Sequence, residues 1–246
     1  MSAAQLAALI RERQPCVVLT DAGVSTESGI PDFRSPTGMW AKVDPLEYAS
    51  LDAFRRDPAK VWSFYAPRFA MLTEAEPNAA HRSLAELERR GLVRAVVTQN
   101  IDLLHERAGS RDVIEVHGSI RSSSCLACAA SYPLAVVEEQ LASRDAPVCL
   151  CGAILKPDVV FFGELLPQAA IDRAYALAAA AALLLVVGST LEVWPVAELP
   201  LVTRRAGGTV AIVNRGPTAR DGDAELRIDG MAATTLESVV AALDAD

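Results

Sequence analysis

Short apolar runs recur along the chain, and longer mixed segments separate them. The runs are rich in Val, Ile and Leu and lie at residues 16–19, 93–97, 113–116, 183–187, 210–213 and 226–228. Uninterrupted apolar runs of this length are typical of strands that are buried on both faces, as in a parallel sheet covered by helices. The pattern therefore predicts six strands of a parallel sheet.

Several of the intervening segments have the apolar spacing of helices. Residues 79–90 form one such segment, which Gly91 ends, and others lie at 168–182, 196–205 and 236–243, with an amphipathic segment at 1–14. Alternation of strands and helices predicts an α/β fold, a Rossmann-like doubly wound parallel sheet. The longest apolar run, residues 174–187, is shorter than the roughly 20 residues that a membrane span needs. We interpret it as a helix end followed by a buried strand.

Two segments break this alternation. Residues 36–78 carry helical patches with aromatic residues and several prolines, and residues 121–157 hold four of the five cysteines. We expect both to be insertions that form a smaller lobe, helical in 36–78 and metal-binding in 121–157. The large lobe would then comprise approximately residues 1–35, 79–120 and 158–246 of a single catalytic domain.

Polar or small residues directly follow the predicted strands. Ligands of open parallel sheets bind in the crevice beyond the carboxyl ends of the strands, so these residues predict one continuous binding cleft. The simpler alternative is that loops after strands are polar because they face water. The residues concerned are Asp21, Ala22 and Gly23, Gln99 to Asp102, His117 and Gly118, Gly188 to Thr190, and Asn214 to Gly216.

The four clustered cysteines have the spacing of a metal site. Cys125 and Cys128 form a Cys-x-x-Cys pair, and twenty residues later Cys149 and Cys151 form a Cys-x-Cys pair. Two close thiolate pairs separated by a loop are what a tetrahedral Zn²⁺ needs, and four cysteines leave no open position for catalysis. The pattern predicts one structural zinc ion. A disulfide, disfavoured in a reducing cytosol, and a thioredoxin-type redox pair are the alternatives.

Composition and charge limit the classes of binding partner that we expect. The chain of 246 residues carries a formal net charge of -8, and like charges form no block. Nucleic acids require a basic face, so we do not expect one as the main ligand. The N-terminal segment lacks a basic region followed by an apolar signal core, and no segment predicts membrane contact. We expect a cytoplasmic protein that is a monomer.

The motifs together resemble those of the sirtuins, the NAD-dependent protein lysine deacylases. They are "GVSTESGIPDFRSP", "TQNIDLLHERAG", "EVHGS", the four-cysteine module, "LKPDVVFFGE", "VGSTLEV" and "VNRGPT", in the family's order from about residue 16 to beyond residue 216. The resemblance implies an enzyme of the transferase class. It also implies a Rossmann-like lobe that holds NAD, a small zinc lobe, and an acyl-lysine peptide or protein clamped between them.

The resemblance also implies roles for individual residues. The backbone of Ala22 and Gly23 would contact the pyrophosphate, with Ser189 and Thr190 after Gly188 bonding the phosphates. Phe33 and Arg34 would cover the nicotinamide ribose. The other NAD contacts would come from Gln99 near the ribose, from Asn100, Ile101 and Asp102 at the nicotinamide, and from Asn214, Arg215, Gly216, Met231 and Ala232 at the adenosine end.

Catalysis in such an enzyme needs a base that removes a proton from a ribose hydroxyl. His117 is the only one of the three histidines at a predicted strand end, and an imidazole suits this task near neutral pH. His81 and His105 lie inside helical patterns, where we expect structural roles. The extended segment Val160, Phe161, Phe162 and Gly163, with Val193, would bind the substrate by strand addition.

Asp21 departs from the family pattern, which has Thr-Gly-Ala-Gly where this chain has Thr-Asp-Ala-Gly. We expect Asp21 to adopt the left-handed conformation that glycine allows there. Its carboxylate beside a pyrophosphate would weaken NAD binding. Asp21 therefore leaves open a weakly active or non-catalytic NAD-binding module. Two further alternatives are mono-ADP-ribosyl transfer, which His117 and the acyl-channel segment disfavour, and a zinc-ribbon nucleic-acid adaptor, which the acidic composition disfavours.

Tyr65 and Arg68, in the segment "WSFYAPRFAML", bear on which acyl group the enzyme would remove. Three residues apart on a helix, they share one face. Family members that favour acidic acyl groups such as succinyl carry a Tyr-x-x-Arg pair there, whose guanidinium can bind a carboxylate. Pro67 should end or kink the helix, and Asp32 matches the deacetylase form of its motif. We predict deacetylation together with desuccinylation of lesser or comparable extent; the alternative is a packed tyrosine beside a solvated arginine.

Overall fold

The computed structural model describes residues 2–32, 38 and 43–245, and it contains the predicted parallel sheet. Six strands pair in the order β3-β2-β1-β7-β8-β9, all parallel. The strands are β1 (Cys16–Thr20), β7 (Leu183–Val187), β8 (Thr209–Asn214), β2 (Ala95–Thr98), β3 (Val113–Glu115) and β9 (Leu226–Asp229). Every predicted apolar run therefore overlaps a strand, and the doubly wound α/β fold is confirmed.

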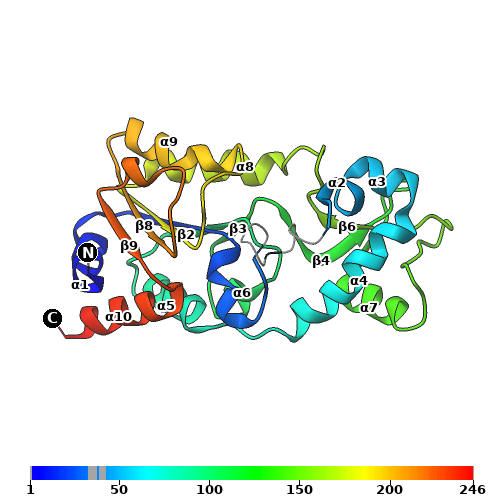
Figure 1. The fold of residues 1–246 in the computed structure, drawn as a ribbon, viewed down its shortest axis with the longest axis horizontal. Helices are drawn as coiled ribbons and strands as arrows, with labels where there is room; N and C mark the ends of the chain where they lie inside the picture. Colours follow the sequence, from blue (N-terminus) through cyan, green and yellow to red (C-terminus); the bar gives the residue numbers. More distant parts are fainter. Residues whose placement is uncertain (1, 33–37, 39–42, 246) are drawn as a thin grey trace.

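Helices cover both faces of this sheet (Figure 1). One face carries α1 (Ala3–Glu12), α5 (Ala79–Arg89) and α10 (Ala232–Asp244), and the other carries α8 (Gln168–Ala180) and α9 (Leu199–Arg205). Successive strand residues alternate between the two layers: Val18 packs with the first set and Leu19 with the second. Burial on both faces explains why the strands are apolar throughout.

The helix predicted over 196–205 is two elements. A 3₁₀ turn, η4 (Val196–Glu198), precedes α9, which has Pro200 in its first turn. Proline has no N–H to donate, so the first turn of an α-helix is where it fits. Elsewhere in the described part of the chain, short 3₁₀ helices are η1 (Ala22–Val24), η2 (Thr26–Ser28) and η5 (Asp221–Asp223).

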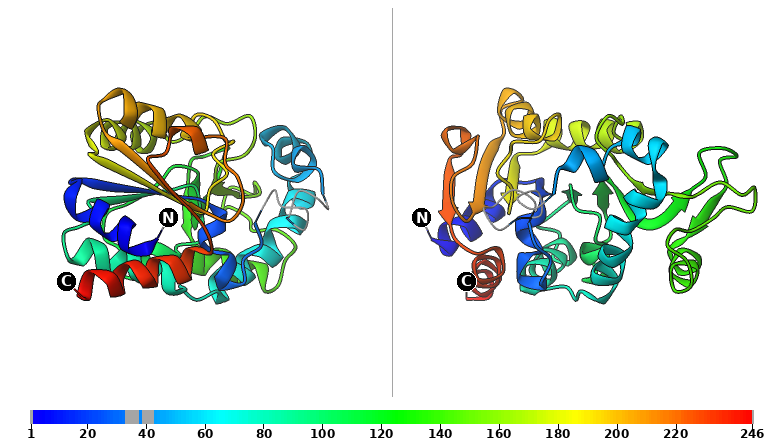
Figure 2. Two further views of the ribbon diagram at one scale, coloured as in Figure 1. Left: turned by 60° about the vertical axis from the view of Figure 1, so that its left-hand side comes forward. Right: turned by 45° about the vertical axis from the view of Figure 1, so that its right-hand side comes forward.

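A second, smaller sheet lies at the other end of the molecule (Figures 1 and 2). It is antiparallel, in the order β5-β4-β6, with β4 (Gly118–Ser124), β5 (Ser131–Pro133) and β6 (Lys156–Val159). Helices α2 (Pro45–Tyr48), α3 (Leu51–Arg56), α4 (Pro58–Glu74) and α7 (Leu134–Leu141) surround it, and α6 (Leu104–Arg107) follows β2. Our division into two lobes remains a proposal, since β4 begins before residue 121.

Of the two effects expected of Pro67, an end or a kink of the helix, the first does not occur. Helix α4 runs through it from Pro58 to Glu74. Buried residues on either side, Tyr65 before it and Phe69 after it, hold both halves of the helix in the small-lobe core. Pro67 and Ser63, whose carbonyl loses its helical donor, are exposed, so water can satisfy that carbonyl. Core packing therefore outweighs the missing backbone bond.

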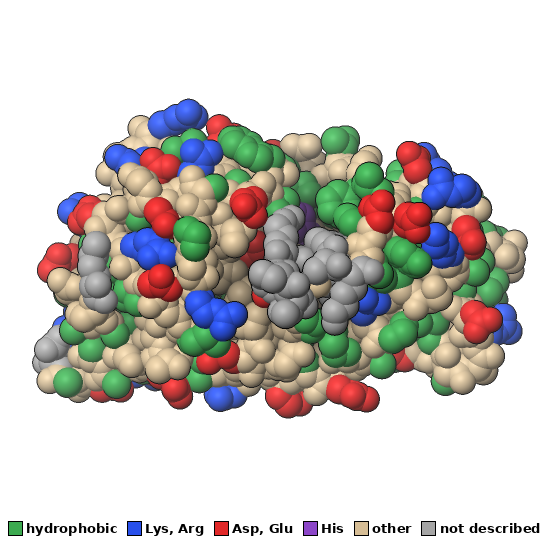
Figure 3. Space-filling view, viewed as in Figure 1, with side chains coloured by type: hydrophobic (Ala, Val, Ile, Leu, Met, Phe, Trp, Pro, Cys, Tyr) green, Lys and Arg blue, Asp and Glu red, His purple; other side chains and the backbone are tan. Residues whose placement is uncertain are grey.

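Within the described residues, no helix is long and apolar enough to cross a membrane. The face in Figure 3 shows Lys and Arg side chains interspersed with Asp and Glu.

Candidate functional site

A cavity of about 370 Å³ lies where the carboxyl ends of the large sheet face the small lobe. Its lining joins residues that follow β1 and β2 to residues of α4 and of the segment after β6. Of the predicted site residues, it is lined by Ala22, Gln99, Asn100, Ile101, Asp102, His117, Tyr65, Arg68, Val160, Phe161, Phe162, Gly163 and Val193. Phe33 and Arg34 lie outside the described residues.

The loops after β1 and β7 touch through glycine backbones. Gly23 N–H donates to the carbonyl of Gly188 at 2.9 Å. A Cβ on Gly23 would lie 2.6 Å from that carbonyl oxygen, and Gly188 has a φ of +66° with Val24 N 2.3 Å from a Cβ. Both positions require glycine, because any side chain would force the two strand ends apart. The sequence thus fixes a backbone cradle at the β1–β7 junction, where the resemblance places the pyrophosphate.

A buried polar network follows β2. Ser25 Oγ donates to Asp102 Oδ2 at 2.7 Å and accepts from Asn100 Nδ2 at 3.0 Å. Asn100 Nδ2 also donates to the carbonyl of Asp21, 3.2 Å away. Burial raises the pKa of Asp102, against the lowering effect of the hydrogen bonds from Leu104 N–H and Ser25. The predicted nicotinamide residues are therefore held rigidly against the β1 loop.

Gln99 contributes a hydrogen-bond acceptor with which a bound ligand could pair. Its side-chain Oε1 is buried and has no hydrogen-bond partner among the described residues, and Gln99 lines the cavity. Buried acceptors in native structures nearly always have a partner. A hydroxyl of a bound ribose would supply one, as predicted for this position, so the cavity fits the sugar of a nucleotide.

His117 lies on the cavity wall, and its Nδ1 contacts a backbone carbonyl. Its Nδ1 is 3.1 Å from the carbonyl oxygen of Gln99. A carbonyl can only accept, so Nδ1 carries the proton and Nε2 holds the lone pair. The imidazole is half-buried. The backbone bond orients the ring and makes Nε2 the nitrogen that carries the lone pair of a base.

His81 and His105 are buried in α5 and α6, as the helical pattern predicted. Their rings lie 4.9 Å apart. Desolvation lowers the pKa of His81 to about 4 and that of His105 well below its ordinary value. Asn78 N–H donates to His81 Nδ1, so the neutral ring donates from Nε2 to Ser25 Oγ, 3.3 Å away. Neither histidine lines the cavity; His81 supports the network behind it.

The remaining NAD candidates line up along the next strand ends. Ser189 and Thr190 follow β7, and Asn214 Nδ2 bonds the carbonyls of Arg215 and Gly216 after β8. Arg215 reaches Met231 Sδ at 3.8 Å, and Ala232 begins α10. The structure therefore brings the residues predicted for the adenosine end to one place, although their contacts with NAD remain predictions.

Asp21 does not adopt the expected left-handed conformation. Its φ is -143° and its ψ -174°, an extended backbone that any residue can adopt. Asp21 Oδ1 accepts from Ala22 N–H at 2.8 Å, and Oδ2 accepts from Ser189 Oγ at 3.0 Å. The backbone at this position thus has no need of glycine, and the carboxylate bonds its own chain.

The segment after β6 is only partly open for strand addition. Val160 N–H donates to the carbonyl of His117, and Phe162 pairs through both backbone groups with Ala49 and Leu51. These bonds hold the segment against the cavity but leave fewer backbone groups for a substrate than its extended sequence indicated. We keep Val160, Phe161, Phe162, Gly163 and Val193 as predicted substrate contacts.

Tyr65 and Arg68 share a helix face that lines the cavity. The Tyr65 ring stacks on Phe161, with centroids 5.2 Å apart. Arg68 lies with its guanidinium carbon 3.3 Å from the centroid of Phe64 and donates to the Phe64 carbonyl. Desolvation lowers the pKa of Arg68 and raises that of Tyr65. Arg68 is therefore a partly desolvated cation at an otherwise largely apolar wall.

Sequence reasoning missed an ion pair between the buried Lys156 and the half-buried Glu164, which flank the predicted substrate contacts. Lys156 Nζ lies 2.9 Å from Glu164 Oε2 and donates to the carbonyls of Pro157 and Val159. The same Glu164 oxygen accepts from Phe161 N–H at 2.8 Å. The signal was a Lys and a Glu flanking an apolar run, which also occurs in exposed strands. We call residues 156–164, closed by this pair, the substrate clasp.

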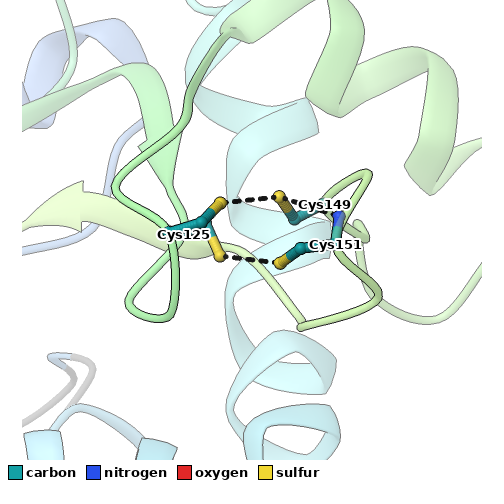
Figure 4. A group of neighbouring side chains, drawn as sticks. Cys125, Cys149 and Cys151 are labelled. Carbon is teal, nitrogen blue, oxygen red and sulfur yellow. Dashed lines mark hydrogen bonds between the residues drawn. The ribbon is translucent and has the colours of Figure 1, made fainter.

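The four cysteines meet as predicted. Their Sγ atoms all lie within 4.8 Å of one another, with 3.5 Å between Cys125 and Cys151 and between Cys128 and Cys149. Cys149 and Cys151 face Cys125 across the gap between two loops (Figure 4). Tetrahedral zinc with bonds of about 2.3 Å places its sulfurs about 3.8 Å apart, close to these separations. All four are free thiols, and the cluster fits one structural zinc ion.

A neighbouring phenol favours metal binding. Tyr132 Oη lies 3.4 Å from Cys149 Sγ and donates to it. This bond is the main cause that lowers the pKa of Cys149 to about 6. Because zinc binds thiolates, Tyr132 helps to prepare the ligand.

Comparison with known proteins identifies the family. The Sir2 family model matches residues 21–195. An NAD-dependent protein deacetylase of Sulfolobus acidocaldarius is 46% identical over 227 residues, which cover 92% of this chain and 89% of the relative. A solved structure of Sir2 with a p53 peptide and NAD⁺ superimposes with a TM-score of 0.92 at 40% identity, covering all of both chains.

A second solved structure holds a Sir2 variant with a deacetylated p53 peptide and 3′-O-acetyl ADP-ribose. It has a TM-score of 0.93 and 41% identity, and covers 98% of each chain. The prediction of an NAD-dependent protein deacylase with a Rossmann-like fold is thereby confirmed. The chain belongs to the Sir2 family.

Proposed function

We propose that this protein removes acyl groups, acetyl first, from lysine side chains of proteins or peptides, with NAD as co-substrate, giving nicotinamide and O-acyl-ADP-ribose. The observation that carries the proposal is the position of His117. Its Nδ1 donates to the Gln99 carbonyl, so Nε2 is the basic nitrogen, and the ring lines a cavity that polar strand ends and an apolar helix enclose together.

NAD supplies a ribose carbon whose bond to nicotinamide breaks as the acyl oxygen of lysine bonds to it. Around that carbon, the network of Asn100, Ser25 and Asp102 fixes the polar wall. Gln99 Oε1 offers an acceptor to a ribose hydroxyl, and His117 Nε2 removes a hydroxyl proton. The aromatic wall from Tyr65 and Phe161 keeps water from the reacting atoms.

The acyl specificity extends to succinyl in this proposal. Arg68 lies on the cavity wall on the same helix face as Tyr65, where a terminal carboxylate of the acyl group would meet a partly desolvated guanidinium. Acetyl groups need no such partner. We therefore expect both reactions, with desuccinylation alone depending on Arg68.

We also infer that the protein works in the cytoplasm. Four clustered free thiols keep their metal only where they remain reduced. The described helices include none that could span a membrane.

The test is incubation with an acetyl-lysine peptide and NAD. We expect nicotinamide and O-acetyl-ADP-ribose in equal amounts, and no product without NAD. Label from NAD that stays attached to the protein substrate would favour mono-ADP-ribosyl transfer instead. NAD binding without any turnover on acylated peptides would favour a non-catalytic module.

A further inference from the structure

Asp21 lies where the loop after β1 meets the loop after β7, two neighbouring strands of the large sheet. Ala22 N–H donates to Oδ1 at 2.8 Å, and Ser189 Oγ donates to Oδ2 at 3.0 Å. One carboxylate therefore bridges two loops that are 168 positions apart in the sequence. The contact joins the two loops that also meet through Gly23 and Gly188.

Both donors have only one proton to give. Ala22 has a single backbone N–H. The Ser189 hydroxyl accepts from Leu191 N–H at 3.1 Å, and its own proton goes to Asp21. While the carboxylate stays in place, neither donor is available to an incoming anion.

The backbone does not require this side chain. Asp21 is extended, and its carbonyl is fixed by Asn100 Nδ2 whatever the side chain is. Glycine or asparagine would therefore fit the same backbone. The carboxylate affects the two donors rather than the course of the chain.

We propose that the Asp21 carboxylate is an internal competitor of the NAD pyrophosphate, which sets the NAD affinity of this chain below that of the same cleft without it. The inference rests on the proposed function, because it takes NAD as the ligand. A carboxylate and a phosphate both accept from N–H and O–H groups, and both are anions. To use Ala22 N–H and Ser189 Oγ–H, the pyrophosphate must displace the carboxylate and approach its charge.

The experiment compares two variants that keep the extended backbone. Asp21→Gly removes the acceptor and the charge, whereas Asp21→Asn removes the charge and keeps an acceptor. Dissociation constants for NAD and ADP-ribose are measured by calorimetry, with nicotinamide, which lacks phosphate, as the comparison ligand. Thermal melting verifies that each variant folds.

We expect Asp21→Gly to bind NAD and ADP-ribose about tenfold more tightly, the value of one competing hydrogen bond of about 1.4 kcal/mol. Asp21→Asn should lie between it and the wild type, and nicotinamide affinity should stay the same. If either folded variant binds NAD no more tightly than the wild type, the competition is overturned. Weaker binding in both would mean that Asp21 accepts from a ribose hydroxyl instead.

Glu192→Gln is the matched control. Thr190 Oγ1 donates to Glu192 Oε2 at 3.1 Å, but Glu192 is exposed, so its removal changes net charge equally without freeing a buried donor. Tightening by this variant equal to that of Asp21→Asn would attribute the effect to net charge and overturn the proposal. Absence of NAD binding in every variant would overturn the proposed function as well, whereas NAD binding that the Asp21 variants do not improve would overturn this inference alone.

Discussion

The strand ends of the large sheet and the cysteine loops of the small lobe both carry chemistry, but different forces hold them. Behind the strand ends lie two extensive layers of buried apolar residues, one on each face of the sheet. Around the cysteines, the fully buried cluster within the described residues is small: Cys125, Cys149 and Leu155, with the partly buried Ala130, Tyr132 and Ala153 packed against it. Apolar burial can therefore hold the first region without a ligand, whereas the second depends on a metal to bring its loops together.

This difference shows where substitutions should act locally and where they should act on folding. In the cleft, a polar side chain can change while the sheet behind it stays intact. In the cysteine module, each metal-binding cysteine also contributes to the free energy of folding. The predictions below test that contrast from the most damaging change to the least.

The largest effect is expected from removing the metal. Purified protein should contain about one zinc ion per chain, since four cysteines make one closed site. Cys149→Ser should unfold the cysteine loops and abolish deacylation, because structural zinc contributes on the order of 10 kcal/mol to such folds. Elemental analysis and circular dichroism follow the loss, and NAD binding reports whether the large sheet survives.

Cys16→Ala is the control for that prediction. Cys16 is buried in β1, far from the cluster in sequence, and burial raises its pKa to about 12, so it is an inert core thiol. This variant should keep its zinc and its activity. Full activity of a metal-free sample would contradict the contrast between the two regions.

The next effect is local to the cleft. His117→Ala should leave the fold and NAD binding nearly intact but lower kcat by ~10²–10⁴-fold, the usual effect of losing a general base. His105→Asn, at a buried histidine outside the cavity, should instead lower the melting temperature. Wild-type turnover by the His117 variant would assign the base to another residue.

The substrate clasp tests the border between the two regions. Lys156→Met leaves Glu164 without its cation, and breaking a buried pair costs about 3 kcal/mol. We expect a lower melting temperature and a KM for the peptide that rises more than the KM for NAD. The reason is that the clasp holds residues 160–163, the predicted substrate contacts, in place. Lys156→Arg should restore much of the peptide affinity, since it keeps the charge and the donors.

Lys60→Met is the matched control. The Lys60–Glu47 pair lies at 3.0 Å with side chains 38% and 55% exposed, against 8% and 21% for Lys156 and Glu164. Exposed pairs contribute about 0–1 kcal/mol. Equal effects of the two substitutions would show that the clasp is no more than another ion pair.

The same difference between the two regions explains which strands could be predicted from the sequence. The run at 183–187 matches its strand at both ends, because burial on two faces leaves an uninterrupted apolar signature. Strand β4, "GSIRSSS", has no such signature, since it is stabilised by pairing with β5 and β6 and by the loops beside the cysteines. Its four serines read as a loop when taken alone.

Site residues show the same division. The clustering of the four cysteines and the place of His117 on the cavity wall could be predicted, because spacing and a position after a strand carry that information, while their roles stay predictions. The contacts of Asp21 with Ser189 and of Lys156 with Glu164 could not, because they depend on which loops meet and on how a segment folds back. The expected left-handed Asp21 was wrong for a local reason: the turn begins after it, at η1.

The smallest expected effect concerns the acyl group, at the wall where the small lobe meets the cleft. Arg68→Met keeps an apolar chain beside Phe64 but removes the guanidinium. A charge-assisted hydrogen bond contributes about 1.5–3 kcal/mol, so kcat/KM for a succinyl-lysine peptide should fall at least tenfold. For an acetyl-lysine peptide, which offers Arg68 no carboxylate, the value should change less than about threefold, within the range of surface substitutions. Arg55→Met, at an exposed arginine of α3, should leave both values unchanged. If Arg68→Met lowered both activities equally, Arg68 would serve packing against Phe64 rather than recognition of the acyl chain, and the small lobe would contribute only structure at this wall.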